Sequence, residues 1–181
     1  MAILPILEVP DPRLRRMSEP VAEVTDEIRA LVADMFETMY AAPGIGLAAA
    51  QVDRPIRLLV MDLSDGPEGP DGKGTKNPRV FINPELYQPS DEQSVYNEGC
   101  LSVPDQFADV ERPATVHARW LDEHGAAHDQ PLDGLLATCL QHEIDHLNGV
   151  LFIDHLSRLK RQMLLRKLEK FRATESKRKA A

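Results

Sequence analysis

Apolar side chains recur every three or four positions between residues 26 and 42, which predicts an amphipathic helix. Thr25 can cap this helix at its start, and Pro43 with Gly44 ends it. Short runs of β-branched or alternating residues follow, bounded by Pro, Gly, Asp or Asn as is typical of strands. These strand candidates are residues 56–61, 79–82 and 115–121.

Two further helical patterns lie toward the end of the chain. Asp133 can cap a helix that runs to about Asn148, and Gly149 stands where a left-handed turn commonly ends a helix. Its predicted core stripe is Leu136, Leu140, Ile144 and Leu147. Another helix is predicted from about His155, with fraying after Phe171. The element order predicts an α+β fold in which short, mostly antiparallel strands pack around the middle helix, with a C-terminal helix added.

Length and composition favour one compact domain covering residues 1–181, because 181 residues with 43% apolar content suffice for one core. Residues 64–78 are so rich in Gly, Pro and charge that we expect an exposed, mobile loop there, away from the chemistry. A basic helix and tail are expected at residues 155–181. Within it, residues 157–181 carry ten Lys or Arg and two Glu, while the rest of the chain carries a net charge of -16. This acidic body argues against nucleic-acid binding.

A cytoplasmic location is expected from the lack of two signals. No apolar run approaches the roughly 18 residues of a membrane span, and the start MAILPILEVPDPR lacks the basic flank and cleavage site of a signal peptide. Cys100 and Cys139 are then better read as thiols or metal ligands than as a disulfide.

The strongest chemical signal is His142-Glu143-Ile144-Asp145-His146, an H-E-x-x-H pattern within the predicted second helix. Residues four apart share a helix face, so both imidazoles can reach one metal ion, and Glu143 can reach a water beside it. This spacing favours metal-dependent hydrolysis. The alternative without a metal site is a polar helix face with two solvated histidines.

A hydrolytic metal usually takes a third protein ligand, and the candidates separate the hypotheses. One protease class would need a histidine at the position where this chain has Phe152, so the chain does not fit that class. A second class would use a glutamate on a following helix, for which Glu169 is available. Cys100 is the other candidate, in a short segment with glycine beside the thiol. A Cys alone is more often a small core residue.

Three segments together resemble the signature motifs of the peptide deformylases, in the same order along the chain. They are GIGLAAAQ at 44–51, EGCLSVP at 98–104 and QHEIDHLNG at 141–149. The resemblance extends from about Leu4 to the final helix, and residues 64–78 look like an insertion. It implies hydrolytic removal of the formyl group from the N-terminal formyl-methionine of new proteins, with release of formate.

The family resemblance also implies roles for individual residues. The metal ligands would be Cys100, His142 and His146, with water as the fourth ligand. Glu143 would be the general acid and base. The formyl oxygen would be stabilised by the metal, the Leu101 backbone N–H and the Gln51 side chain. Thiolate with two imidazoles would suit zinc, whereas the resemblance implies Fe²⁺, with Ni²⁺ or Co²⁺ as active substitutes.

The expected substrate contacts rest on the family resemblance and on helix geometry. By resemblance, the peptide backbone pairs as an added strand with Ile45, Gly46 and Gly99. By helix geometry, the expected walls of the methionine pocket are Leu135, Thr138 and Cys139. For Cys139, ordinary core packing is the alternative. Phe107 departs from the arginine or tyrosine often found at its position, which affects the expected pocket rim.

Several surrounding residues receive weaker interpretations. Asp145 is a candidate to orient a ligand histidine, and Glu98 to anchor the Cys100 segment. Four other histidines match no motif: His117, His124, His128 and His155. The basic C-terminal helix suggests docking on the anionic ribosome surface. Two rival classes remain open, a peptidase that uses Glu169 and a catalytically silent relative that serves as a binding module.

Overall fold

The computed structural model describes residues 2–69 and 73–179. Within these residues, three α-helices and seven strands make up an α+β domain, as expected, and all the strands pair in antiparallel fashion. The helices are α1 (Asp26–Ala41), α2 (Gly134–Leu147) and α3 (Arg158–Lys179). The strands are β1 (Gly46–Ala48), β2 (Leu58–Met61), β3 (Arg79–Tyr87), β4 (Gln93–Cys100), β5 (Val103–Pro113), β6 (Val116–Leu121) and β7 (Ala127–Leu132).

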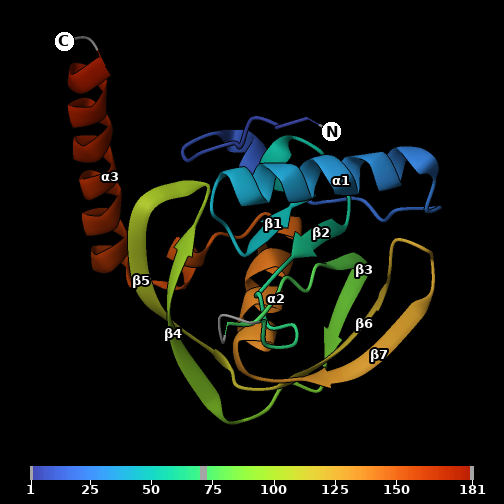
Figure 1. Cartoon of the computed structure of the whole chain (residues 1–181). Helices are drawn as coiled ribbons and strands as arrows, with labels where there is room; N and C mark the ends of the chain where they lie inside the picture. Colours follow the sequence, from blue (N-terminus) through green and yellow to red (C-terminus); the bar gives the residue numbers. More distant parts are fainter. Residues whose placement is uncertain (1, 70–72, 180–181) are drawn as a thin grey trace.

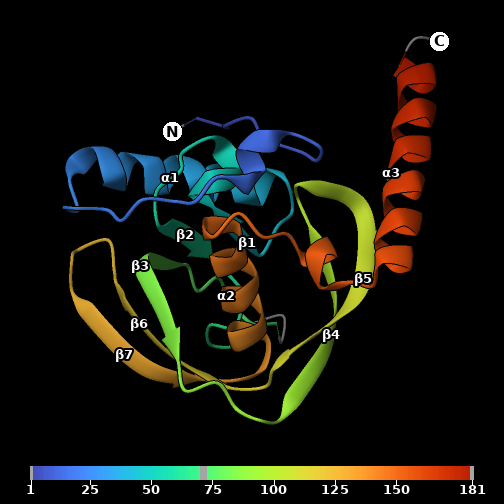
Figure 2. The same cartoon turned by 180° about the vertical axis from the view of Figure 1, so that it is seen from behind.

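The strands form two separate sheets around α2 (Figures 1 and 2). Five of them make one sheet in the order β1-β2-β3-β6-β7, while β4 and β5 form a long hairpin of their own. The central helix packs on the five-stranded sheet through an apolar stripe that includes Leu140, Ile144 and Leu147. On the other side it meets the hairpin, and α1 covers β1 and β2. The predicted packing around the middle helix is therefore confirmed.

The ends of the first two helices agree with the sequence pattern, with one correction. Thr25 caps α1 by accepting a hydrogen bond from the Ile28 backbone N–H. Asp133 is the N-cap residue of α2, but its side chain makes no capping hydrogen bond. Gly134 follows it with a left-handed backbone (φ +56°). This unusual first turn explains why the expected side-chain cap is not formed.

The third helix differs from its predicted bounds at both ends. It starts at Arg158, after a separate 3-10 turn over Phe152–His155, and the Ser157 hydroxyl accepts from the Lys160 backbone N–H. Instead of fraying after Phe171, it continues to Lys179. Its last turns contain strong helix formers, which favour continuation, and Arg172 forms an ion pair with Glu8 of the N-terminal segment.

The strand predictions were right in place but incomplete in extent. The first candidate shrinks to Leu58–Met61, and the second extends from Arg79 to Tyr87. Four strands had no predicted counterpart, namely β1, β4, β5 and β7. None of the helices in the described part of the chain combines the length and apolar character needed to cross a membrane.

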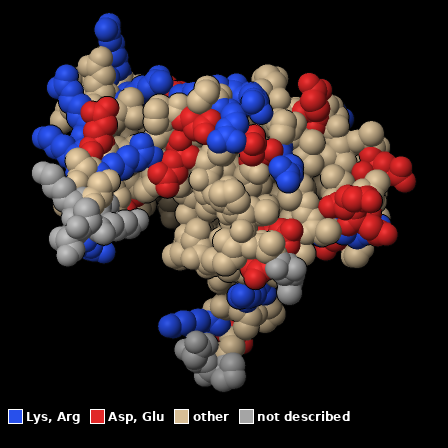
Figure 3. All heavy atoms as spheres, turned by 90° about the horizontal axis from the view of Figure 1, so that it is seen from above, with Lys and Arg blue, Asp and Glu red and all other residues tan. Residues whose placement is uncertain are grey.

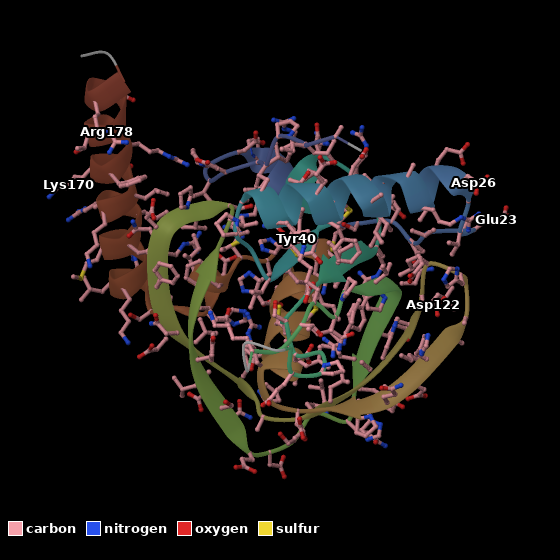
Figure 4. All side chains as sticks on the ribbon, viewed as in Figure 1. Glu23, Asp26, Tyr40, Asp122, Lys170 and Arg178 are labelled. Atoms are coloured by element: carbon pink, nitrogen blue, oxygen red, sulfur yellow. The ribbon has the colours of Figure 1, made fainter. Side chains whose placement is uncertain are left out.

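Residues 64–78 are largely exposed where the structure describes them, and the base of the segment is anchored. Asp65 forms an ion pair with Arg79 at the start of β3. Asp62, just before the segment, accepts hydrogen bonds from the Tyr40 hydroxyl and from two backbone N–H groups. Tyr40 projects from α1 toward this region (Figure 4). Burial alone would raise the pKa of Asp62, but these hydrogen bonds lower it overall.

Gly149 ends α2 in a position that tolerates no side chain. Its φ is +71°, and a Cβ built there would lie 2.5 Å from the Arg15 carbonyl oxygen. We expect Gly149→Ala to reduce the free energy of unfolding by about 2–4 kcal/mol, since backbone strain and the clash add. Urea unfolding would measure this. Gly125→Ala is the matched control, because Gly125 has a φ of +78° and nothing within 4 Å. Equal losses in the two variants would contradict a role for the Arg15 contact.

Candidate active site

The α2 helix carries the three polar residues at the centre of the candidate site. His142, Glu143 and His146 are 8%, 4% and 1% exposed, respectively. The two imidazoles lie one turn apart, with ring centroids 5.1 Å from each other. Burying three polar groups on one helix face is costly without compensating partners, so this face is built for something other than packing.

Cys100 reaches the two histidines from the end of β4. A register shift between Gly99 and Cys100 interrupts the hairpin ladder there, and the thiol turns toward α2. Its Sγ lies 3.2 Å from His146 Nε2. Ligand atoms of Cys100, His142 and His146 all lie within 4.8 Å of one another.

This donor set fits a divalent transition metal. Donors that share one tetrahedral ion at 2.0–2.3 Å stand roughly 3.3–3.8 Å apart, which the cluster can meet with small adjustments. Thiolate and imidazole are also the ligands that such ions prefer in proteins. Glu143 is close to the cluster in sequence but is not part of it.

One ligand histidine is oriented by a buried carboxylate. Glu98 Oε2 lies 2.8 Å from His142 Nδ1, which leaves Nε2 directed to the cluster. Arg112 donates two hydrogen bonds to the same carboxylate, from Nε (2.6 Å) and from an NH2 group (3.0 Å). Burial alone would raise the pKa of Glu98. The contacts with His142 and Arg112 outweigh burial and lower this pKa to about 2. Glu98 is therefore an anion buried beside the site.

Arg112 extends this chain of contacts to the protein surface. Its other NH group donates to Asp145 Oδ2 (2.8 Å), and the same oxygen lies 2.7 Å from His155 Nε2. Asp145 was a candidate to orient a ligand histidine, but it reaches His142 only through Arg112 and Glu98. His155, which matched no motif, belongs to this network.

Removal of Arg112 is expected to destabilise the protein strongly. Its side chain is 5% exposed and that of Glu98 is 4% exposed. Breaking a buried ion pair from one side typically costs about 3–5 kcal/mol, because the partner charge stays buried. We expect a loss of this size for Arg112→Met in urea unfolding. Arg119→Met is the control, since its pair with Glu85 is about 60% exposed and should change stability by less than about 1 kcal/mol. Similar losses in both variants would contradict this assignment.

Gln51 approaches the cluster from a 3-10 turn after β1 (Ala49–Val52). Its Oε1 accepts from the Ala48 backbone N–H (2.8 Å), which fixes the direction of the amide. Its Nε2 then points to Cys100 Sγ (3.5 Å) and the Ser102 hydroxyl (3.1 Å). The predicted amide donor thus lies beside the thiol. Ser102 belongs to the EGCLSVP segment, yet sequence reasoning assigned it no role.

Glu143 faces Gly46, a residue of the predicted peptide-pairing strand. A Cβ on Gly46 would lie 2.4 Å from Glu143 Oε1, so glycine is what allows this close approach. The other oxygen, Oε2, is buried with no hydrogen-bond partner among the described residues. Burial raises the pKa of Glu143 to about 7. A carboxylate in this environment is suited to exchange protons near neutral pH.

A cavity of about 550 Å³ opens over this cluster. It brings together all the predicted substrate-contact residues, namely Ile45, Gly46, Gly99, Leu135, Thr138 and Cys139, along with Gln51, Leu101 and Phe107. Burial raises the pKa of the Cys139 thiol, so this wall stays uncharged. Sequence reasoning missed Tyr96 and Val103, which also line the cavity.

Comparison with known proteins points to one family. The family model described as polypeptide deformylase matches residues 3–162. A peptide deformylase of Rhizorhabdus wittichii is 70% identical, over 95% of this chain and 97% of its own length. One from Zymomonas mobilis is 61% identical, over 95% of this chain and 96% of its own.

Solved structures agree with these relatives. The crystal structure of a peptide deformylase from Legionella pneumophila matches with a TM-score of 0.86 and 43% identity, covering 97% of this chain and 98% of that one. The Ehrlichia chaffeensis enzyme, solved in complex with actinonin, matches with a TM-score of 0.84 and 45% identity, over 94% and 98%.

The chain therefore belongs to the peptide deformylase family. It is a hydrolase of the metal-dependent class that removes the N-formyl group from newly made peptides. The sequence resemblance to this family is confirmed, and the rival classes of peptidase and silent binding module are not favoured. Glu169, the third ligand that the peptidase would need, is exposed on α3 and lies outside the metal-ligand cluster.

Proposed function

We propose that Cys100, His142 and His146 hold the metal ion and that Glu143 moves the protons of the deformylation reaction. The observation that carries this proposal is the convergence of the three ligand atoms within 4.8 Å, beside a cavity that is lined by Cys100, His142 and Glu143. We further propose that residues 1–181 act as one catalytic domain in the cytoplasm, with residues 64–78 and 155–181 as appendages.

Cys100, His142 and His146 would hold a divalent ion, which would supply Lewis acidity to the formyl carbonyl and lower the pKa of a neighbouring water. Glu143 takes one proton from the attacking water as its oxygen bonds to the formyl carbon. The Gln51 amide and the Leu101 backbone N–H donate hydrogen bonds to the formyl oxygen as negative charge grows there. Glu143 then gives the proton to the amine nitrogen as the C–N bond breaks, so that formate and a free N-terminus leave.

The substrate side follows from the shape of the cavity. The peptide backbone would lie between the strand edge at Ile45 and Gly46 and that at Gly99, as an added strand. Leu135, Thr138 and Cys139 would then receive the methionine side chain. These walls present apolar surface and one hydroxyl, which suits an unbranched thioether better than a charged side chain.

The proposed metal is Fe²⁺, with Zn²⁺, Ni²⁺ or Co²⁺ as substitutes. Thiolate and imidazole accept all four ions, so the ligands alone do not select one. Metal analysis of anaerobically purified protein, with reconstitution by each ion in turn, would identify the ion. The highest turnover with zinc alone would overturn the iron assignment.

The test of the proposed function is formate release from a formyl-Met-Ala-Ser peptide by anaerobically purified protein. We expect rapid release, with no cleavage of the corresponding unformylated peptide. Internal cleavage of the unformylated peptide would instead support a peptidase. Absence of both reactions from metal-loaded protein would overturn the proposal.

We also propose that α3 docks on the ribosome. Lys and Arg gather around this helix, while Asp and Glu gather at the opposite end of the molecule, near the start of α1 (Figure 3). The family match ends at residue 162, so most of α3 lies beyond it. A chain shortened after Ala173 keeps the Arg172–Glu8 pair and loses the terminal charges. Ribosome co-sedimentation that is equally strong and salt-dependent in this variant would exclude a role for the terminal turns.

A further inference from the structure

A second hollow lies directly beside the cavity, between the β4–β5 hairpin and α3. It has a volume of about 320 Å³. Three residues of the hairpin line both hollows, namely Asn97, Gln106 and Phe107. The hollow therefore adjoins the candidate active site, with the Phe107 side chain between the two. We call it the α3 groove.

Phe107 forms the boundary between the two hollows. Its ring lies against Gly99, where a Cβ would be 2.4 Å from the ring Cε1 atom, and its side chain is 65% exposed. Met163, on the α3 side, is 52% exposed. An apolar surface thus leads out of the cavity, from the strand edge proposed to hold the peptide, toward α3. A chain leaving that edge could follow this surface.

Two cations line the α3 groove on the helix side. Lys160 and Lys167 stand two turns apart on α3, on the face that also carries Met163 and Leu164. Both lysines are exposed, and neither ammonium group makes an ion pair among the described residues. Asp109 is the one acid of the lining, and its carboxylate accepts a hydrogen bond from Asn97 (2.8 Å). The groove therefore offers positive charge beside apolar surface.

We infer that the α3 groove binds the part of the formylated chain that follows its first residues and favours an acidic side chain there. This inference rests on the proposed function and adds a substrate preference to it. Each residue of an extended peptide advances about 3.3 Å, so the groove would be reached a few residues after the methionine. Lys160 and Lys167 would attract the carboxylate, and Phe107 with Met163 would cover the adjoining backbone.

The test uses formyl-Met peptides of seven residues in which a single Glu is moved from position 3 to position 6, each compared with its Gln counterpart. At low salt we expect one Glu position to raise kcat/KM about threefold to tenfold through a lower KM, as for two partly exposed ion pairs. High salt should remove the preference. The double variant Lys160→Gln, Lys167→Gln should lose it at low salt.

A charge-matched control separates a local site from general attraction. Arg166→Gln with Lys170→Gln removes two charges from the same helix, at positions that do not line the groove. Lys170 points away from the domain (Figure 4). This control should keep the Glu preference. The inference is overturned if the parent shows no preference, if the groove variant keeps it, or if the control loses it equally.

Two measurements distinguish failure of this inference from failure of the proposed function. Formyl-Met-Ala is too short to reach the groove, so the parent and both double variants should deformylate it at equal rates. No formate from this substrate would count against the proposed function. Fluorescence anisotropy would measure the affinities of the Glu and Gln peptides for Glu143→Gln protein, so that binding in the groove is observed without turnover. Equal affinities there would overturn the groove assignment.

Discussion

Replacement of Glu143 by Gln is expected to lower kcat for formate release by about 10²–10⁴-fold, which is the usual contribution of a positioned general acid or base. Gln fills the same space against Gly46 but cannot accept the proton of water. The side chain is 4% exposed, so bulk water does not replace it readily. Steady-state kinetics would measure the loss, while metal analysis should show that the ion is retained.

A second buried carboxylate supplies the control for this variant. Asp62 is 3% exposed, directly follows β2 and is hydrogen-bonded to Tyr40, outside the cavity lining. We expect Asp62→Asn to lower thermal stability while leaving kcat within about threefold, since no proton transfer depends on it. Comparable kcat losses in the two variants, or near-parental activity of Glu143→Gln, would contradict the assigned role.

Cys100→Ala is expected to abolish both metal binding and turnover. It removes one of three protein ligands, and the remaining histidines would hold a divalent ion far more weakly. Metal content after gel filtration should fall from about one ion per chain to near zero. Formate release should then be at background.

The other cysteine is the natural control. Cys139 is 6% exposed on α2 and lines the cavity without joining the ligand cluster. Cys139→Ala should retain the metal, and its cost is a modest loss of stability from a small cavity, about 1–2 kcal/mol. Retention of a stoichiometric ion by Cys100→Ala would exclude Cys100 as a ligand. Loss of the ion from Cys139→Ala would show that the cluster has been assigned to the wrong thiol.

The sequence predicted the helical half of the fold well and the sheet half poorly. Apolar periodicity located α1 and α2 within a residue or two because each helix buries a continuous stripe. By contrast, β4 and β7 are mostly exposed and polar, as in Gln93–Cys100, and show no clean alternation. Their stability comes from pairing with a neighbouring strand, which a local pattern does not reveal.

For the site, the short motifs and the family resemblance predicted which residues gather at the cavity, but not the buried ion pair behind them. H-E-x-x-H placed His142 and His146 on one helix face, and the structure brings Cys100, the third ligand implied by the resemblance, into the same cluster. Arg112 had no signal, because an arginine on a strand reads as a solvated residue until its buried partners are known. Glu98 was expected to anchor the Cys100 segment. Its carboxylate contacts His142 and Arg112, two residues that the prediction did not name as its partners.

The division into two sheets has a consequence for the order of folding. The β4–β5 hairpin and the α2 helix are each held by local contacts, which form within microseconds. Cys100 and His146, however, are 46 positions apart and come from different layers. They meet only when the hairpin docks on the helix, a step that must close a long loop and is therefore slower. In refolding, the helical circular dichroism signal would thus recover before the protein regains the ability to bind a metal. The catalytic centre would be among the last parts of the molecule to form.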